Sequence, residues 1–211
     1  MSLWGQLNLL DPSSVIQAEM LLFHDHAMVI LISIFCLVSF MGVKILANKL
    51  SVRTIHEAQD LESIWTILPA ITLLFLALPS LRLLYLIDEE KSGLPVKVTG
   101  RQWYWSYQVG DQAPFDSFLI REKDLALGDY RLLEVDSRLS APLSTDLTIL
   151  CSSADVLHSW ALPSAGMKLD AVPGRLNSMG VFFNYSGVFY GQCSEICGAN
   201  HSFMPIAVEV L

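Results

Sequence analysis

Charged residues, basic residues and cysteines are all scarce in this chain. Of its 211 residues, 16% are charged, four are cysteine, and acidic side chains outnumber basic ones by 21 to 13. Four scattered cysteines do not make the disulfide framework of a small secreted domain. The net charge of −8 makes nucleic acid an unexpected partner, because nucleic-acid binding relies on Lys and Arg. The sequence also has no nucleotide-binding glycine motif, internal repeat or low-complexity tract.

The first 26 residues contain no Lys or Arg. A secretory signal begins with a basic segment and a transit peptide is rich in Arg, so we expect neither here. The nearest basic residues are Lys44, Lys49 and Arg53. Because short basic loops stay on the inner side of a membrane, this segment is expected to face the cytoplasm or the mitochondrial matrix.

Long apolar runs, by contrast, occur twice. Residues 27–43 are uncharged over 17 positions and residues 63–81 over 19. A helix needs ~20 mostly apolar residues to cross a bilayer, so both runs with their flanks predict transmembrane helices. The predicted order is an outer segment at 1–26, helices at 27–47 and 63–87 joined by an inner loop at 48–62, and an outer domain at 88–211.

After these runs, short segments rich in β-branched and aromatic residues alternate with turn residues, which predicts an all-β sandwich or barrel. The predicted strands are 96–99, 103–109, 131–135, 147–151, 167–172, 176–183, 188–192 and 206–210. Alternation places Trp103, Trp105 and Tyr107 on one face of their strand, as core or interface packing. Cys36 and Cys151 are expected to be buried as small apolar side chains.

The most specific pattern lies near the C-terminus. Cys193, Cys197, His201 and Met204 fall within twelve residues, and His158 lies 35 positions upstream of Cys193. Thiolate, imidazole and thioether form a soft ligand set that favours copper. A disulfide leaves His201 and Met204 unexplained, zinc rarely uses methionine, and a mononuclear copper site uses only one cysteine. A dinuclear copper centre, bridged by both thiolates and capped by one histidine on each metal, uses every residue.

Four motifs, in the correct order, resemble those of one family. Residues 191–205 (GQCSEICGANHSFMP) resemble the copper loop of cytochrome c oxidase subunit II, and 155–160 (DVLHSW) its upstream histidine motif. Residues 101–107 (RQWYWSY) resemble its aromatic motif and 64–70 (IWTILPA) its second membrane segment. The resemblance implies a transmembrane α-helical hairpin followed by an all-β, cupredoxin-like Greek-key barrel. It also implies a dinuclear copper centre, CuA, held by His158, Cys193, Cys197, His201, Met204 and the main-chain carbonyl of Glu195.

The resemblance further implies a function. In this family CuA takes electrons from ferrocytochrome c and passes them to haem a of the catalytic subunit, where O2 is reduced to water with proton pumping. The chain is then expected among other oxidase subunits in the mitochondrial inner membrane, with both termini and the copper domain in the intermembrane space. Trp103 is implied as the point where electrons enter, and the side chain of Glu195 as a ligand of Mg2+ shared with the catalytic subunit. Glu62 is implied at the entrance of a proton path, although an acid there also suits the dipole of its helix.

Acidic residues dominate the outer domain. Residues 103–211 carry 12 acidic and 6 basic side chains, a net charge of −6. Such a surface is either simply solvated or a docking face for a basic protein, because complementary fields speed and orient an encounter. The resemblance implies docking of cytochrome c at Asp116, Asp129, Asp136 and Asp155.

Three other functions compete with this interpretation, and the two predicted membrane helices argue against one of them, a free copper-domain reductase. A membrane-tethered copper carrier is expected to have an exposed, exchangeable site with few ligands. A quinol oxidase subunit, the related structural module, lacks the Cys/His/Met set.

Overall fold

The computed structural model describes residues 4–54, 56–88 and 92–211. Two units make up the chain: a helical unit, Leu21–Tyr85, and an outer unit formed by Met1–Met20 together with Leu86–Leu211.

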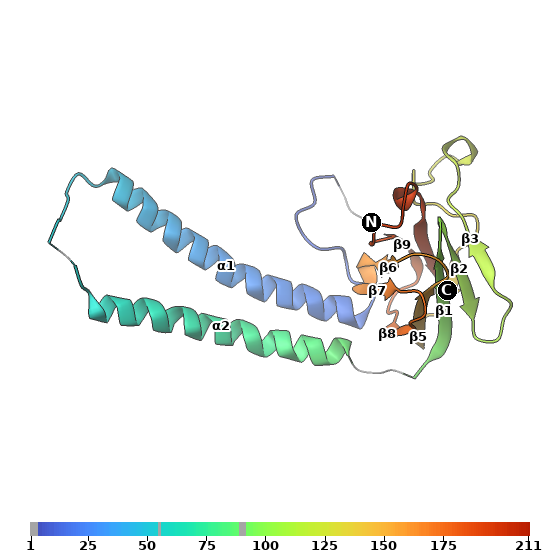
Figure 1. Ribbon diagram of the computed structural model, residues 1–211, viewed down its shortest axis with the longest axis horizontal. Coiled ribbons are helices and arrows are strands. Elements are labelled where there is room, and N and C mark those ends of the chain that lie inside the picture. Colours follow the sequence, from blue (N-terminus) through green and yellow to red (C-terminus); the bar gives the residue numbers. More distant parts are fainter. Residues whose placement is uncertain (1–3, 55, 89–91) are drawn as a thin grey trace. The chain divides into compact units, whose positions relative to one another are not determined.

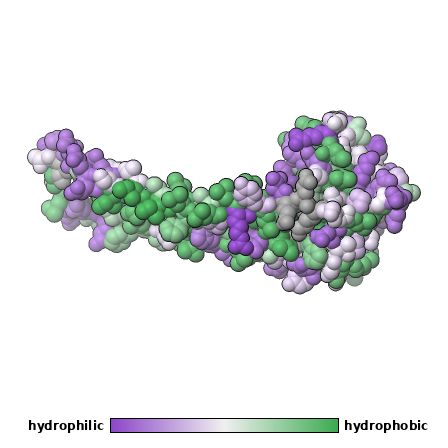
Figure 2. Space-filling model, turned by 90° about the horizontal axis from the view of Figure 1, so that it is seen from below, coloured by the Kyte–Doolittle hydropathy of each residue, from purple (hydrophilic) through white to green (hydrophobic). Residues whose placement is uncertain are grey.

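The helical unit is a hairpin of two long helices, α1 (Val15–Ala47) and α2 (Gln59–Ile87), which run in opposite directions (Figure 1). Both are long and apolar enough to cross a membrane, and most of the hairpin surface in view is hydrophobic (Figure 2). α1 begins twelve positions before the predicted span at residue 27, because the hydroxyl of Ser14 accepts a hydrogen bond from the N–H of Gln17 (3.1 Å). Such an N-cap satisfies a free donor of the first turn and fixes where the helix starts.

The expectation that Cys36 is buried is wrong. Its side chain is exposed on α1. Among the described residues, none in the apolar window of either helix is buried, so apolar side chains here are available to face the membrane or other subunits instead of a core.

Pro79 interrupts the hydrogen bonding of α2. Proline has no N–H, so the carbonyl of Phe75, four residues earlier, loses its helical partner. Nε2 of His26 on α1 lies 3.1 Å from that carbonyl oxygen. Because no water in the bilayer core can satisfy a free carbonyl, an N–H donated by His26 joins the two helices where the proline weakens one of them.

Replacement of His26 by leucine should therefore destabilise the hairpin by about 0.6 kcal/mol and at most about 1.7, the range of interhelical hydrogen bonds in membranes. Unfolding of the full chain in mixed detergent micelles measures this change. In a Pro79→Ala background the carbonyl of Phe75 regains its helical donor, so the same substitution should have a smaller effect. An equal effect in both backgrounds would contradict the role given to His26.

The outer unit is a β-barrel. Its described strands are β1 (Leu94–Arg101), β2 (Tyr104–Val109), β3 (Phe115–Ser117), β4 (Leu139–Ala141), β5 (Asp146–Ser153), β6 (His158–Leu162), β7 (Met167–Ala171), β8 (Asn177–Phe182), β9 (Gly187–Gln192) and β10 (Pro205–Val210). They form sheets of order β3-β2-β1-β5-β8, β4-β10-β9 and β6-β7. The pairs β1–β5 and β4–β10 are parallel and join strands far apart in sequence, as Greek-key connections do.

The barrel core follows the predicted alternation. Leu147, Ile149 and Cys151 of β5 are all buried and alternate with more exposed neighbours. This confirms the expectation for Cys151. Burial raises the pKa of its thiol to about 12, so it stays a neutral packing group.

The predicted strand at 131–135 is wrong. The segment turns, with Leu132 at φ 65°, and only Val135 bridges to another segment, at Leu119. The carboxylate of Glu134 is buried and accepts hydrogen bonds from the hydroxyl of Tyr190 (2.6 Å) and the guanidinium of Arg138 (3.2 Å). The two buried positions of this segment, Glu134 and Val135, therefore hold a turn against the barrel.

Candidate metal centre

The candidate ligands come from two places in the barrel. His158 is the first residue of β6, and residues 193–204, called the metal loop here, connect β9 to β10. Antiparallel pairing sets Gln192 opposite Pro205, so both ends of the loop are held side by side. A loop anchored in this way by two hydrogen-bonded strands places its side chains accurately.

The six predicted ligands converge on one another. Sγ of Cys193 is 3.9 Å from Nδ1 of His158 and 3.4 Å from the carbonyl oxygen of Glu195. Sγ of Cys197 is 3.6 Å from Nδ1 of His201 and 3.5 Å from Sδ of Met204. The imidazole of His201 also reaches the thiol of Cys193, and the ligand atoms of His158, Cys193 and Cys197 all lie within 4.8 Å of one another. The thioether of Met204 lies beside Cys197, and the carbonyl of Glu195 lies beside Cys193.

The centre is buried except at one edge. His158, Cys193, Cys197 and Met204 are buried, whereas His201, in the short η3 helix (His201–Phe203), is half-buried. A site of this kind keeps most water away from a bound metal and leaves one imidazole edge near the surface.

The ionisation of these groups favours metal binding. Burial alone would raise the pKa of the Cys193 thiol, but hydrogen bonds from His158 and from the backbone lower it below its usual value. Burial, together with the neighbouring Cys193, raises the pKa of Cys197. The pair therefore loses its first proton more readily than its second, and a bound cation would favour the loss of both.

Asp155 supports the ligand His158. Its Oδ1 accepts from Nε2 of the imidazole at 2.8 Å, which leaves Nδ1 free to point toward Cys193. Partial burial would raise the pKa of this carboxyl, but hydrogen bonds from His158, Val156 and Gln102 hold it below its usual value. Carboxylates commonly orient metal-binding histidines in this way. Sequence reasoning assigned Asp155 to docking and missed this contact.

Two further residues shape the centre and were not singled out from the sequence. Gly100 on β1 faces the imidazole of His158: a Cβ built there would lie 2.8 Å from Cδ2 and 2.9 Å from Cγ of the ring. Trp105 is buried and donates from Nε1 to the carbonyl of Met204 (3.2 Å), while its ring meets His158 edge-on at 5.9 Å between centroids. It therefore braces two ligands at once.

Trp103 is not part of the strand predicted for it. Strand β2 begins at Tyr104, and Gln102 and Trp103 form the two-residue tip of the β1–β2 hairpin, between the paired residues Arg101 and Tyr104. Trp105 and Tyr107 are buried, as expected, but Trp103 is half-buried and its indole N–H has no protein partner in the described part of the chain. A Cβ built at Gly198 would lie 3.1 Å from Cζ2 of this ring. Trp103 therefore lies against Gly198 of the metal loop, the residue that follows Cys197.

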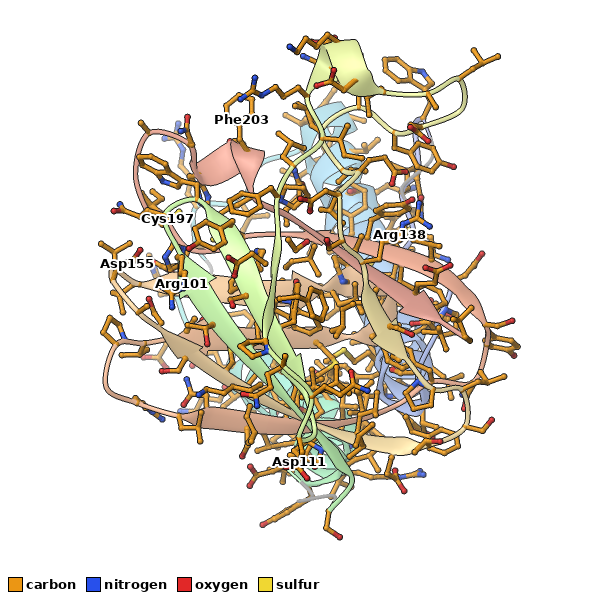
Figure 3. The ribbon with its side chains drawn as sticks, turned by 90° about the vertical axis from the view of Figure 1, so that its right-hand side faces the viewer. Arg101, Asp111, Arg138, Asp155, Cys197 and Phe203 are labelled. Atoms are coloured by element: carbon orange, nitrogen blue, oxygen red, sulfur yellow. The ribbon has the colours of Figure 1, made fainter. Side chains whose placement is uncertain are left out.

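The predicted docking acids differ in their exposure and in the hydrogen bonds that their carboxylates accept within the chain. Asp116 is exposed on β3. Asp129 accepts from the N–H of Ala126 and Asp136 from that of Phe118, both at 2.8 Å, so these carboxylates also hold turns in place. Figure 3 shows Asp155 and Cys197 at the same end of the barrel, beside Arg101.

Two more predicted site residues are exposed. Glu195 projects from the metal loop. Glu62 lies near the start of α2, where its carboxylate reaches back to the N–H of Ala58 (3.4 Å). This contact agrees with the helix-end interpretation of Glu62, because the carboxylate satisfies a free donor there.

The donors present fit copper. Two thiols, two imidazole Nδ1 atoms and a thioether are soft ligands, and they are gathered in a pocket that also excludes water. Met204 is fully buried with its sulfur toward Cys197, which a structural zinc site would leave unused.

Comparison with known proteins agrees with this chemistry. The family profile described as cytochrome c oxidase subunit II, periplasmic domain, matches residues 94–211, and the profile for its transmembrane domain matches residues 2–83. Cytochrome c oxidase subunit 2 of Albinaria caerulea is 64% identical over 214 residues, covering 100% of this chain and 96% of that protein. The corresponding protein of Drosophila yakuba is 50% identical over 212 residues, covering 99% and 93%.

A solved structure supports the fold. The periplasmic domain of subunit II of cytochrome oxidase from Bradyrhizobium japonicum is 44% identical with a TM-score of 0.53, over 58% of this chain and 86% of that one. These matches confirm the predicted helical hairpin followed by a cupredoxin-like barrel. Because they cover both the membrane segments and the outer unit, the chain belongs to the cytochrome c oxidase subunit II family.

Proposed function

We propose that this chain binds a dinuclear copper centre, takes single electrons from ferrocytochrome c and passes them to haem a of the catalytic subunit. The observation that carries the proposal is the convergence of two thiols and two imidazoles, with Sγ of Cys193 3.9 Å from Nδ1 of His158 and Sγ of Cys197 3.6 Å from Nδ1 of His201. Two thiols and two imidazoles would supply ligands for two metals. A mononuclear copper site, which uses two histidines, one cysteine and a weak axial methionine, would leave one thiol without a role.

When bound, such a centre accepts and releases one electron at a time. The chain supplies a rigid and largely dry cradle, with the loop ends fixed in β9 and β10 and His158 oriented by Asp155. Little then has to move when the charge of the centre changes, which suits fast electron transfer. The reduction of O2 to water and the pumping of protons belong to the catalytic subunit.

Electrons are proposed to reach the metal loop through Trp103, which lies between the barrel surface and Gly198. Cytochrome c is proposed to dock over this end of the barrel. Asp116, Asp129, Asp136 and Asp155 are the proposed docking acids, with Asp129, Asp136 and Asp155 also holding local structure.

The remaining roles follow from the family. We place the chain in the mitochondrial inner membrane, with the loop between α1 and α2 in the matrix and the barrel in the intermembrane space. The exposed carboxylate of Glu195 is proposed to bind Mg2+ shared with the catalytic subunit, since hard oxygen ligands suit that ion. Glu62 is proposed to lie at the entrance of a proton path in that subunit.

A membrane-tethered copper carrier fits these observations less well. Release of copper to an acceptor requires accessible ligands, whereas Cys193, Cys197, His158 and Met204 are all buried.

Metal analysis and EPR of the chain purified in detergent test the proposal. Two coppers per chain should share one unpaired electron in the oxidised state, so the EPR spectrum should show coupling to two copper nuclei. A single copper per chain, or the spectrum of one isolated Cu(II), would rule out the dinuclear centre.

A further inference from the structure

The tip of the β1–β2 hairpin is held from outside the hairpin. Two-residue hairpin loops favour Asn-Gly, Asp-Gly or Gly-containing pairs, because these residues adopt the required turn conformations. Here the two residues are Gln102 and Trp103, and neither has a positive φ, so the tip is not one of these turns. Contacts with other parts of the barrel contribute to its conformation.

Gln102 makes such contacts with both its backbone and its side chain. Its backbone N–H donates to Oδ2 of Asp155 at 2.7 Å, and its side-chain Nε2 donates to the carbonyl of Cys197 at 2.7 Å. The same Asp155 orients His158 through its other oxygen, at 2.8 Å. Gln102 is therefore joined directly to one cysteine ligand and, through a single carboxylate, to one histidine ligand.

The side chain of Trp103 has no comparable hydrogen bond: its indole N–H is buried without a partner in the described part of the chain. Its ring packs on the barrel core and lies beside Gly198, where a Cβ would be 3.1 Å from Cζ2. The position of this ring therefore depends on that packing and on the backbone that carries it. That backbone is fixed on one side by β2 and on the other by Gln102.

We propose that Gln102 is a positioning residue for electron transfer: its side-chain hydrogen bond to the carbonyl of Cys197 holds Trp103 against the metal loop. The inference rests on the proposed function, because it assigns Gln102 a role that acts only through Trp103. One electron leaves ferrocytochrome c and one arrives at the centre, and no proton or bond changes at Gln102.

The decisive variant is Gln102→Met, which keeps the length of the side chain and removes its donor. In the assembled oxidase, stopped-flow reduction of the copper centre by ferrocytochrome c should slow by about 10- to 100-fold, the scale of a misplacement of ~1 Å. Reduction by a small inorganic reductant, which does not need Trp103, and the copper EPR spectrum should stay unchanged. Gln112→Met, in the exposed turn after β2, is the matched control and should behave as the wild type.

A double-mutant cycle with Trp103→Ala separates this role from a general structural one. If Gln102 acts through Trp103, adding Gln102→Met to Trp103→Ala should cause no further slowing. The proposal would be overturned if Gln102→Met slowed transfer equally in the wild type and in Trp103→Ala. It would also be overturned if Gln102→Met alone had the wild-type rate or lost its copper.

Hydrogen exchange of the Trp103 indole N–H gives a readout that needs no copper. In the copper-free full-length chain labelled at tryptophan nitrogen, this proton should exchange several-fold faster in Gln102→Met than in the wild type. Unchanged exchange would show that Gln102 does not hold the ring. If the wild-type oxidase took no electrons from cytochrome c, the proposed function would fail, while the exchange measurement would still decide whether Gln102 fixes Trp103.

Discussion

Replacement of Gly100 by alanine should lower the copper content of the centre to fewer than two coppers per chain. The added Cβ would lie 2.8 Å from Cδ2, 2.9 Å from Cγ and 3.0 Å from Cβ of His158. Because even the Cβ of the histidine is in the way, rotation of the imidazole does not relieve the clash. Rotation would also break the 2.8 Å contact with Asp155 that directs Nδ1 toward Cys193.

The fold should survive this substitution better than the site. The carbonyl of Gly100 accepts hydrogen bonds from the N–H of Ala154 and the hydroxyl of Ser153, and alanine keeps that carbonyl. Overpacking of a core typically lowers the free energy of unfolding by ~1–3 kcal/mol. The largest change is therefore expected at the metal, as fewer than two coppers per chain and an altered EPR spectrum.

Copper content, EPR and thermal unfolding should be measured on the same preparation. Gly42→Ala is a suitable control, because a Cβ there meets nothing within 4 Å. Two coppers per chain with an unchanged spectrum in Gly100→Ala would show that His158 is not a ligand in the orientation described here.

The ligands themselves could be predicted because they lie close together in sequence. Cys193, Cys197, His201 and Met204 occupy one loop whose ends pair in β9 and β10, so spacing alone brings them near one another. The prediction of His158 as a ligand also required the upstream histidine motif. The structure adds which nitrogen faces which sulfur, a detail that depends on Asp155 and cannot be read from spacing.

The supporting residues could not be predicted because each depends on a tertiary contact. Gly100 matters only because His158 packs on it, and Gln102 only because the carbonyl of Cys197 lies opposite. No periodicity marks such residues in a single sequence. Gln102 lies within the aromatic motif at 101–107, but the motif does not show which group its side chain contacts.

Three described strands were missed: β3 and β4, which have three residues each and are too short to show a period, and β6. β6 (His158–Leu162) is buried at every position and so shows no period of two, and it was missed. The segment 131–135 has buried positions at Glu134 and Val135 but uses them to hold a turn. Trp103 was assigned to a strand because the aromatic pattern continues through it, although the chain turns just before Tyr104.

Replacement of Trp103 by alanine should slow electron transfer from docked cytochrome c by orders of magnitude while the copper centre stays intact. The ring lies against Gly198, the residue after Cys197, and its removal takes away the aromatic group that contacts this part of the metal loop. Trp103 is not a ligand, so copper content and the EPR spectrum should change little. Affinity for cytochrome c, which depends on the acidic surface, should also change little.

A packing role predicts the opposite pattern. Truncation of a fully buried aromatic lowers the free energy of unfolding by ~3–5 kcal/mol, and copper would then be lost together with the fold. Trp103 is only half-buried, whereas Trp105 and Trp160 are completely buried, so we expect a smaller loss of stability for Trp103→Ala. Thermal unfolding and stopped-flow reduction of the same variant distinguish the two roles.

Tyr104→Ala provides the matched control on the same hairpin. Its ring stacks on Phe118 at 4.4 Å between centroids rather than on the metal loop, so its removal should lower stability without slowing electron transfer. Trp103→Phe keeps an aromatic ring at the tip and should recover part of the rate. A normal rate in Trp103→Ala would leave Trp103 as a packing residue. Equal slowing in Tyr104→Ala would lead to the same conclusion, because the effect would then follow the loss of any aromatic side chain at the hairpin and not the loss of the contact with Gly198.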